Sequence, residues 1–334
     1  MAGVNLFEVV VHERRREAEG VVSLDLRPLQ GALPAFTAGA HIDVEVQLPG
    51  PGNHRALRQY SLCNDPAEPH RYVIGIGRDA ASRGGSVWLC DQVQAGHTLR
   101  IGTPRNHFRL VEDAAHTILV AGGIGITPLL AMARRLSALG RRWTLYLCAR
   151  SPERAAFLAE AQHLPGLVVP VFDGMPGVAS LDLAGLVGQA TPDTHLYCCG
   201  PEALMHAFER ACAGRDPSTV HVEWFKAPAT ASAVGASTAA STTGADRGFT
   251  VQLQRSQRQL DVPAGTSILD VLLAAGIDVA HSCCDGVCGT CETRVLGGRP
   301  DHRDAVLLGP DAQAQDRIMV CVSRCHDEVL TLDL

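Results

Sequence analysis

The stretch Ser282-Cys-Cys-Asp-Gly-Val-Cys-Gly-Thr-Cys291 decides how the C-terminal part of the chain folds. Its cysteines at 283, 288 and 291 follow a C-x4-C-x2-C pattern. Cys321 comes about thirty residues later, a spacing typical of plant-type loops that hold one [2Fe–2S] cluster. A loop of this length can aim several thiolates inward, and its glycines permit close backbone approach and positive φ. The sequence therefore predicts a plant-type [2Fe–2S] domain with Cys283, Cys288, Cys291 and Cys321 as ligands.

The residues alone leave alternatives to this ligand set. A structural zinc site usually has paired C-x2-C units, and only one such unit occurs here. Cys284 and Cys325 are neighbours that could compete as ligands, although Cys284 breaks the loop spacing and Cys325 comes one turn late. Cys321 is favoured because it follows the apolar run Ile318–Val320, which we expect to be a strand.

A segment dominated by Ala, Ser, Thr and Gly separates this domain from the rest of the chain. Residues 227–247 lack apolar periodicity, which is typical of a linker. The C-terminal domain then spans residues 248–334, an ordinary domain size. The N-terminal body changes character near residue 112, so we place its two domains at residues 1–111 and 112–226.

Residues 1–111 contain short segments of alternating or β-branched character, separated by Pro, Gly and Asn-Asp turns. Many short strands with turn signals favour an all-β barrel or sandwich. We expect strands at Phe7–Val11, Val21–Leu26, His41–Leu48, Arg58–Leu62, Arg71–Ile76 and Thr98–Ile101.

Beyond residue 112, buried strands alternate with Gly-rich turns and helices. This alternation indicates a parallel α/β sheet. We expect helices at Leu129–Leu139 and Glu153–Gln162, and strands at Thr117–Val120, Trp143–Ala149, Val168–Phe172, Thr194–Tyr197 and His221–Val222.

Composition narrows the function classes. The formal net charge of −6 argues against a nucleic-acid partner, because domains that bind nucleic acid are usually basic. No apolar run is long enough to span a membrane, and no secretory signal is visible. The 12 cysteines suggest metal or redox chemistry in a reducing compartment, so we expect a cytoplasmic protein. The cysteines outside the ligand set mostly lie in apolar runs, where small buried hydrophobes are the simpler interpretation.

The segment Arg58-Gln-Tyr-Ser61 suits a flavin. An arginine can pair with phosphate, a tyrosine ring can pack on isoalloxazine, and a serine can hydrogen-bond the ring edge. The motif alone is weak, since an ordinary barrel strand could carry it. The downstream stretch Ser82-Arg-Gly-Gly-Ser86 precedes an expected helix near Val87 and Trp88. Backbone N–H groups at such a helix start favour an anion, so Arg58 and Ser86 could hold one phosphate from two sides.

The segment Ala121-Gly-Gly-Ile-Gly-Ile-Thr-Pro128 follows a buried strand and precedes a helix. Its glycines would let a dinucleotide pyrophosphate approach the backbone, and Pro128 suits the first helical position. It lacks the full G-x-G-x-x-G pattern and would be weak evidence by itself. A second stretch at the end of a later strand, Tyr197-Cys-Cys-Gly-Pro201, strengthens the prediction of a dinucleotide site. Cys199 would lie where a nicotinamide ring could sit, or it is a core cysteine.

The stretch Glu223-Trp-Phe225 stands just before the linker. An aromatic side chain here could cover the flavin face. A hydrophobic plug between domains is an equal alternative.

These motifs, in this order, resemble the phthalate dioxygenase reductase family, which includes reductase components of Rieske oxygenases. The resemblance runs over nearly the whole chain and rests on the motifs above together with Asp301-His-Arg-Asp304 and Cys321-Val-Ser-Arg324. It implies an antiparallel flavin β-barrel, a parallel-sheet NAD domain and a β-grasp ferredoxin domain. It also implies FMN, NADH and one [2Fe–2S] cluster as cofactors.

The resemblance assigns site residues by position. The cofactor-binding set at the flavin would be Arg58, Gln59, Tyr60, Ser61, Gly75, Ile76, Gly84, Gly85 and Ser86, with Thr127 nearby and Phe225 on the ring face. NADH would bind along Gly123, Gly125, Pro128, Cys199, Gly200 and Pro201. No acid–base residue is assigned, because hydride transfer needs none. Asp301, His302 and Asp304 are interpreted as a structural loop or part of a partner surface.

The order of carriers implies that electrons pass from NADH to FMN, then to the cluster, then to an external partner. We expect a monomer that serves a Rieske-type aromatic-ring dioxygenase or O-demethylase. A cytochrome-type monooxygenase is an alternative acceptor, and a redox carrier without turnover is a non-enzymatic alternative. NADH is favoured over NADPH, although Arg150 and Arg154 follow the second strand of the NAD domain, where a 2′-phosphate could be bound.

Overall fold

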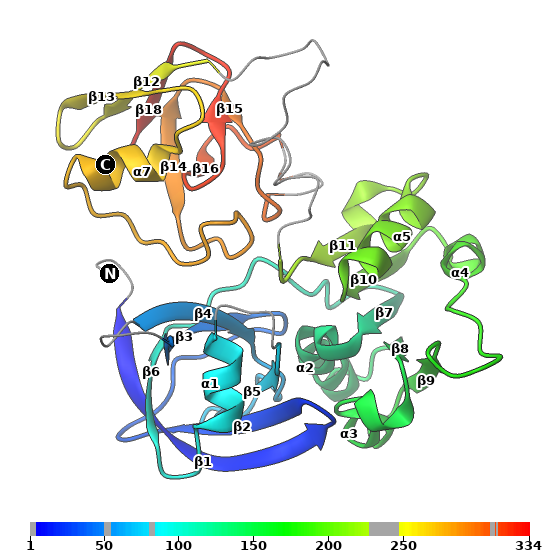
Figure 1. Cartoon of the computed structure of the whole chain (residues 1–334). Coiled ribbons are helices and arrows are strands. Elements are labelled where there is room, and N and C mark those ends of the chain that lie inside the picture. Colours follow the sequence, from blue (N-terminus) through cyan, green and yellow to red (C-terminus); the bar gives the residue numbers. More distant parts are fainter. Residues whose placement is uncertain (1–4, 50–54, 80–83, 227–246, 308–310, 312) are drawn as a thin grey trace. The chain divides into compact units, whose positions relative to one another are not determined.

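The computed structural model of the chain describes residues 5–49, 55–79, 84–226, 247–307, 311 and 313–334. These residues form two units, Asn5–Glu223 and Trp224–Leu334 (Figure 1). Nearly all of the predicted linker, residues 227–246, lies outside the described residues.

The first part of the larger unit is an antiparallel sheet in the order β4-β3-β6-β1-β2-β5. An isolated antiparallel bridge between Leu62 and Ile74 links the ends of the two edge strands, so the sheet closes into a barrel. All six predicted strands are present, because alternating apolar side chains fill the barrel interior. The elements are β1 (Leu6–Ala18), β2 (Val21–Pro28), β3 (His41–Gln47), β4 (Arg55–Ser61), β5 (Tyr72–Gly77), α1 (Gly85–Asp91) and β6 (Thr98–Gly102).

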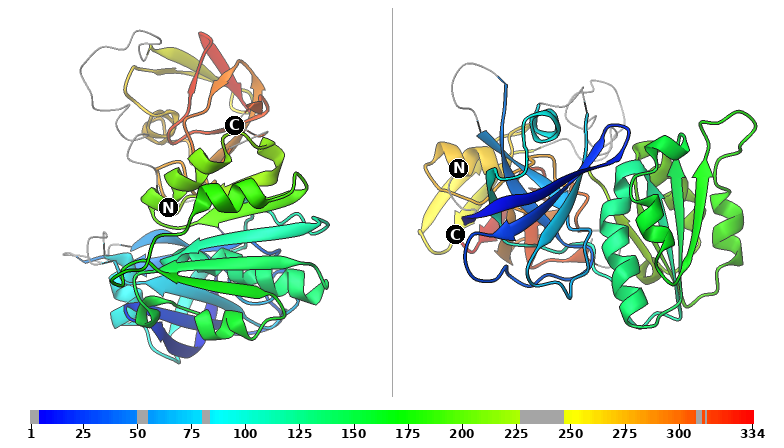
Figure 2. Two further views of the ribbon diagram at one scale, coloured as in Figure 1. Left: turned by 90° about the vertical axis from the view of Figure 1, so that its right-hand side faces the viewer. Right: turned by 90° about the horizontal axis from the view of Figure 1, so that it is seen from below.

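The second part is a parallel sheet in the order β11-β10-β7-β8-β9. Helix α2 packs on one face with Tyr197 and Cys199 of β10, while Cys198 contacts Met205 of α5 on the other. Figure 2 shows helices on both faces of this sheet. The elements are β7 (His116–Gly122), η1 (Gly123–Gly125), α2 (Ile126–Ala138), β8 (Trp143–Ala149), η2 (Pro152–Arg154), α3 (Leu158–Gln162), β9 (Leu167–Phe172), α4 (Leu183–Gln189), β10 (Thr194–Cys199), α5 (Glu202–Cys212), η3 (Pro217–Thr219) and β11 (Val220–Glu223).

The predicted helix over Glu153–Gln162 is wrong in its first half. A short 3₁₀ turn, η2, is followed by a break at Phe157, and only α3 is α-helical. Phe157 has a φ of 59° and is 4% exposed. A left-handed backbone is costly for an aromatic residue, so burial of this ring against the barrel outweighs local helix preference.

The smaller unit contains a mixed sheet in the order β13-β12-β18-β14-β16, with a separate pair β15–β17. Helix α7 lies across the sheet and buries Ile268, Leu269 and Leu272 (Figure 1). This is the predicted β-grasp arrangement. The elements are β12 (Phe249–Leu253), β13 (Arg258–Val262), α7 (Ile268–Ala274), β14 (Glu292–Gly297), β15 (Pro300–Asp301), β16 (Arg317–Met319), β17 (Arg324–Cys325) and β18 (Val329–Leu332).

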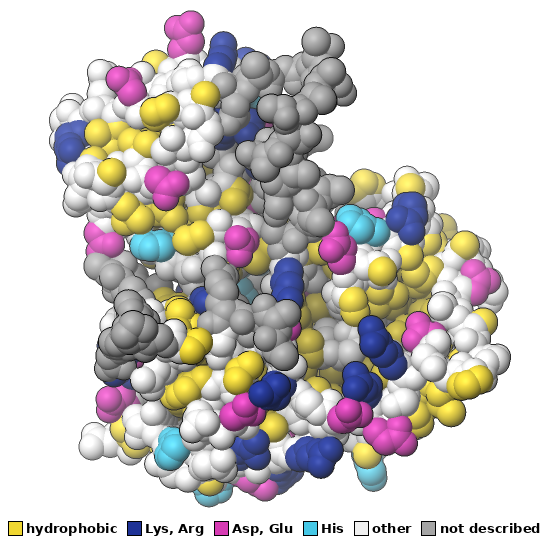
Figure 3. Space-filling view, viewed as in Figure 1, with side chains coloured by type: hydrophobic (Ala, Val, Ile, Leu, Met, Phe, Trp, Pro, Cys, Tyr) yellow, Lys and Arg dark blue, Asp and Glu magenta, His cyan; other side chains and the backbone are white. Residues whose placement is uncertain are grey.

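The surface of the barrel carries both signs of charge. Arginines and acidic side chains are interspersed over the face visible in Figure 3. Ion pairs such as Arg78–Asp91 (2.9 Å) and Arg27–Asp25 (3.2 Å) account for part of this mixing. Within the described part of the chain, no helix has the length and apolar character needed to cross a membrane.

Candidate functional site

Strand β4 carries the predicted flavin motif beside β3. Arg58 lies opposite Val44, and Ser61 lies opposite His41. Burial raises the pKa of the Tyr60 phenol well above its ordinary value. Gln59 has a partner inside the barrel wall, because its Nε2 donates to Asp43 Oδ1 at 2.5 Å. Arg58 of the same strand donates from Nη1 to the Leu57 carbonyl at 2.8 Å.

The start of helix α1 approaches β4 closely. Gly84 has a φ of 100°, and a Cβ on Gly85 would lie 2.9 Å from Val46 and 3.2 Å from Arg58 Cγ. Only glycine permits this conformation and this approach. The N-terminal amides of α1, Ser86 and Arg58 are thus gathered in one place, which fits a phosphate group.

Strand β5 joins the barrel to the nucleotide sheet. A Cβ on Gly75 would lie 2.6 Å from Thr127 Cγ2 and 2.9 Å from the Phe157 ring. Ile76 is fully buried in the barrel core, so we expect its backbone, not its side chain, to face a flavin. Gly75 and Thr127, both predicted site residues, are therefore in direct contact across the two sheets.

Two glycine-containing loops meet at the carboxyl ends of β7 and β10. A Cβ on Gly125 would lie 2.2 Å from the Cys199 carbonyl oxygen, and one on Gly122 would lie 2.4 Å from Pro201. Gly200 packs equally closely on Gly122. Adjacent strand ends of a parallel sheet are where nucleotides bind, so this pair of loops fits a dinucleotide.

Three details of this region differ from the sequence-based expectation or refine it. Helix α2 begins at Ile126, so Pro128 occupies the third helical position instead of the first; its missing N–H is still tolerated in the first turn. Gly123 has a φ of 53°, which favours glycine. The Cys199 side chain is fully buried and packs under α2, which favours the core interpretation for its thiol.

Glu223 is a candidate site residue that the sequence analysis did not single out. It ends β11 opposite Cys199, and its Oε2 accepts a hydrogen bond from Ser61 Oγ at 3.5 Å. Burial raises the pKa of its carboxyl to about 8. The available signal was an acidic residue at the carboxyl end of a strand, between the apolar Val222 and Trp224.

Phe225 belongs to the smaller unit and is 40% exposed. Its exposure leaves the ring face open to contact. Its placement over the flavin stays a prediction.

The four predicted cluster ligands come together inside the smaller unit. Cys283, Cys288, Cys291 and Cys321 are at most 8% exposed. The side chain of Cys283 interacts with those of Cys288 and Cys321, and the side chain of Cys291 interacts with that of Cys321.

Backbone amides also point at these sulfurs. The N–H of Asp285 donates to Cys283 Sγ at 3.3 Å, and Cys288 Sγ lies 3.1 Å from Thr290 Oγ1. Four converging thiols with amide donors fit an iron–sulfur cluster. The zinc alternative is disfavoured by the sequence, which has one C-x2-C unit where structural zinc sites usually have two.

The competing cysteines lie elsewhere. Cys284 has a φ of 58° and is exposed, so it turns away from the buried thiols. Cys325 lies in β17, where its thiol donates to the Val329 carbonyl at 3.8 Å and accepts from Asp327 N–H at 3.3 Å. The geometry therefore gathers the predicted set and leaves out both competitors.

Arg154 has a structural partner. Its Nη2 pairs with Glu19 Oε1 of the barrel at 2.8 Å. Arg150 packs on Gly174, whose Cβ would lie 2.5 Å from the Arg150 carbonyl oxygen. Engagement of Arg154 with the barrel disfavours a role in reading a 2′-phosphate.

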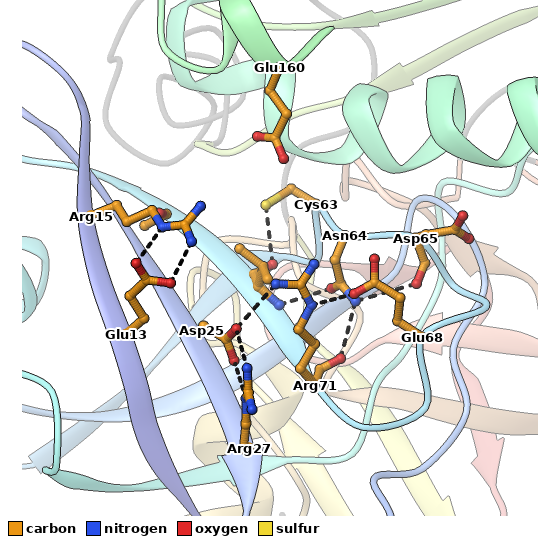
Figure 4. Close-up of polar contacts among 12 residues, drawn as sticks. Glu13, Arg15, Asp25, Arg27, Cys63, Asn64, Asp65, Glu68, Arg71 and Glu160 are labelled. Carbon is orange, nitrogen blue, oxygen red and sulfur yellow. Dashed lines mark hydrogen bonds and ion pairs between the residues drawn. The ribbon is translucent and has the colours of Figure 1, made fainter. Parts of the chain in front are cut away.

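A polar cavity lies where the barrel meets α2 and α3, away from the predicted site residues. Figure 4 shows Asp25 between Arg27 and Arg71, and Glu160 of α3 above Cys63. Arg71 Nη1 lies 3.2 Å from Asp25 Oδ2, and Cys63 donates to the Val73 carbonyl at 3.2 Å. These pairings neutralise the cavity wall and make it part of the joint between the two sheets.

Comparison with known proteins agrees with this architecture. The family described as "2Fe-2S iron-sulfur cluster binding domain" matches residues 251–326. The phenoxybenzoate dioxygenase subunit beta of Ectopseudomonas oleovorans is 46% identical over 97% of this chain and 96% of its own. A solved phthalate dioxygenase reductase, titled a modular structure for electron transfer from pyridine nucleotides to [2Fe–2S], has a TM-score of 0.67 and 38% identity. Its alignment covers 99% of this chain and 98% of that chain.

A third similar protein is larger. An intact type IV self-sufficient cytochrome P450 monooxygenase has a TM-score of 0.85 and 36% identity; the match covers 98% of this chain and 41% of that chain. The same three-part arrangement therefore also occurs as a segment of a longer polypeptide.

A flavin barrel, a dinucleotide-binding sheet and a plant-type ferredoxin domain in one chain define an NADH-dependent flavin iron–sulfur oxidoreductase. The predicted fold class and the cofactor set of FMN, NADH and a [2Fe–2S] cluster are confirmed. The chain belongs to the phthalate dioxygenase reductase family.

Proposed function

We propose that this protein is the reductase component of an oxygenase system and passes electrons from NADH to a Rieske-type aromatic-ring dioxygenase or O-demethylase. The observation that carries the proposal is the contact of Gly75 in the barrel with Thr127 in the first turn of helix α2. Because the flavin and nucleotide motifs meet there, ligands held by the two motifs would lie next to each other.

The bound cofactors supply the redox chemistry, in which a two-electron hydride transfer is converted into single-electron delivery. The chain positions them. Arg58 and Ser86 would hold the flavin phosphate from two sides, and Ser61 would contact the ring edge. Gly123, Gly125 and Gly200 let the dinucleotide backbone approach the carboxyl edge of the sheet.

Glu223 is the acid of this site. At neutral pH its raised pKa keeps most of the carboxyl protonated, so it can donate a hydrogen bond as well as accept one from Ser61. We assign it a positioning role between Ser61 and the Cys199–Pro201 loop.

The Rieske partner is supported by the relatives whose names contain dioxygenase. A cytochrome P450 partner is the second candidate, since the self-sufficient P450 monooxygenase contains a similar segment.

NADH in place of NADPH is supported by the engagement of Arg154 with Glu19. We also propose a monomer in the cytoplasm; the many thiols support the location.

The test uses the purified holoprotein under anaerobic conditions. NADH should bleach the flavin band and then produce the electron paramagnetic resonance signal of a reduced [2Fe–2S] cluster. Adding a Rieske oxygenase should restore the oxidised spectra, and a P450 should do so more slowly. Flavin that stays oxidised with NADH would rule out the reductase function. A faster response to the P450 would favour the second candidate.

The Cys321→Ser variant is the matched control. It should still reduce ferricyanide with NADH through the flavin, yet fail to support the oxygenase. Equal support of the oxygenase by this variant would contradict the proposed order of carriers.

A further inference from the structure

The carboxyl group of Asp304 is fully buried beside the ligand-bearing segments of the ferredoxin unit. Its Oδ1 accepts hydrogen bonds from the backbone N–H groups of Val306 at 3.0 Å and Leu307 at 2.7 Å. Its Oδ2 accepts from Ser323 Oγ at 3.0 Å, and His302 Nδ1 lies 3.7 Å away. Burying a carboxyl costs free energy unless its oxygens accept hydrogen bonds. These donors therefore hold the Asp304 carboxyl in the interior of the unit.

The hydrogen bond between Ser323 and Asp304 connects this carboxyl to the segment that contains the fourth ligand, Cys321. Ser323 is fully buried and follows Cys321 by two residues. Besides donating to Asp304, its Oγ accepts from the Arg303 N–H at 3.1 Å. The side chain of Ser323 therefore ties the turn that contains Cys321 to residues 303–304.

A backbone hydrogen bond next to Asp304 connects residues 304–305 to the cysteine loop. The N–H of Ala305 donates to the carbonyl oxygen of Gly286 at 2.9 Å. Gly286 stands between Cys283 and Cys288 and has a φ of 71°; a Cβ there would lie 3.2 Å from Asp304 Cα. Residues 304–305 thus touch both segments that supply cluster ligands.

We propose that Asp304 is a positioning residue of the iron–sulfur centre, which fixes the Cys321 turn against the Cys283–Cys291 loop and, through its negative charge, makes the bound cluster a stronger electron donor. This deepens the proposed function, on which it rests. The sequence motif Asp301–Asp304 thereby gains a role at the centre.

The charge effect follows from electrostatics. An anion in a protein interior disfavours an added electron nearby. At an effective dielectric constant of about 20, one unit charge inside a small domain changes such an equilibrium on the order of tenfold. Neutralising Asp304 should therefore make the cluster easier to reduce.

The test compares three variants of the full-length holoprotein. Asp304→Asn removes the charge and keeps an acceptor oxygen. Ser323→Ala removes the hydrogen bond and keeps the charge. Asp301→Asn is the matched control, because this less buried carboxyl pairs with Arg303 Nη2 at 2.7 Å.

Two quantities are measured: the cluster midpoint potential, titrated with dithionite and redox dyes, and the half-life of the cluster absorbance with an iron chelator. Asp304→Asn should favour reduction of the cluster roughly tenfold, which raises its midpoint potential by about 59 mV for one electron. It should also shorten the half-life of the cluster several-fold. Ser323→Ala should shorten the half-life with a smaller shift in potential. Asp301→Asn should change neither.

Equal values for Asp304→Asn and Asp301→Asn would overturn the proposal. If Asp304→Asn takes up no cluster, Ser323→Ala decides, and an unchanged half-life in that variant overturns the positioning role. Dithionite reduces the cluster without NADH, so the comparison of variants does not depend on the proposed electron path. A failure of that path would instead appear as a lack of cluster reduction by NADH in the unmodified protein. Ferricyanide reduction by NADH should be the same in all variants.

Discussion

Ser61 Oγ in the barrel and Glu223 Oε2 at the end of the nucleotide sheet lie 3.5 Å apart, although 162 positions separate the two residues. Ser61 belongs to the flavin strand, and Glu223 lies opposite Cys199 in the β10–β11 register. The two predicted cofactor motifs are therefore connected through the Glu223 carboxyl.

The first prediction concerns the pH dependence of stability. The pKa of Glu223 rises from 4.5 to about 8 in the folded protein, so the folded state holds a proton that the unfolded state releases between these values. Stability should then fall as pH rises from about 5 to 8, with a slope approaching one proton per molecule. Glu223→Gln, which stays neutral, should lose this slope.

The melting temperature of the flavin-containing unit, followed by flavin fluorescence from pH 5 to 9, measures the slope. Glu153→Gln is a control, because Glu153 is exposed and its pKa is lowered, chiefly by a hydrogen bond from Ser151. Parallel curves for the unmodified protein and Glu223→Gln would show that Glu223 does not titrate in this range.

The second prediction concerns the joint between barrel and nucleotide sheet. Gly75→Ala would place a methyl group 2.6 Å from Thr127 and 2.9 Å from Phe157. Overpacking of this kind typically costs 1–3 kcal/mol, so the larger unit should lose about that much stability. Because the contact lies between the two motifs, flavin reduction by NADH should also slow.

The matched control is Gly188→Ala in α4, where nothing lies within 4 Å of the added methyl. Alanine is favoured over glycine in a helix by up to about 1 kcal/mol, so this variant should be as stable or slightly more stable. Urea unfolding and stopped-flow reduction compare the two. Unchanged stability and an unchanged rate of flavin reduction in Gly75→Ala would mean that this contact is not important for either property.

The strands could be predicted because local alternation reflects burial directly. His41–Leu48 and Trp143–Ala149 are strands within one residue of the expected bounds. The break at Phe157 could not, because the left-handed backbone there is stabilised by barrel residues far away in sequence. Local patterns contain no record of such contacts.

The site was predictable where spacing itself carries chemistry. The C-x4-C-x2-C loop identifies three ligands without a structure. The apolar run before Cys321 favoured it over Cys325, and the fold adds that the Cys325 thiol lies in β17 with partners of its own. Glu223 escaped notice because one glutamate at a strand end carries no signal until the register places it beside Ser61.

The third prediction concerns nucleotide choice. Arg154→Ala should leave the ratio of kcat/KM for NADH and NADPH unchanged, because Arg154 pairs with Glu19. Both side chains are about half exposed, so the loss of stability should be at most about 1 kcal/mol. Steady-state ferricyanide reduction with each nucleotide checks the ratio. A rise in preference for NADH would mean that Arg154 does contact the 2′-phosphate.

The last prediction concerns the fourth ligand. Cys321→Ser should abolish cluster binding, because the buried Cys321 side chain lies beside those of Cys283 and Cys291. Cys325→Ser should retain the cluster, since that thiol is directed to the Val329 carbonyl. Cys284→Ser should also retain it, because Cys284 is exposed.

Iron content and visible absorbance of the purified variants distinguish these outcomes, with flavin content as the internal reference. All three substitutions replace one sulfur by one oxygen, so a general effect of the change would appear in each. A cluster retained by Cys321→Ser and lost by Cys325→Ser would require β17 to supply the ligand. Asp327 N–H and the Val329 carbonyl, which now bond to that thiol, would then have to release it.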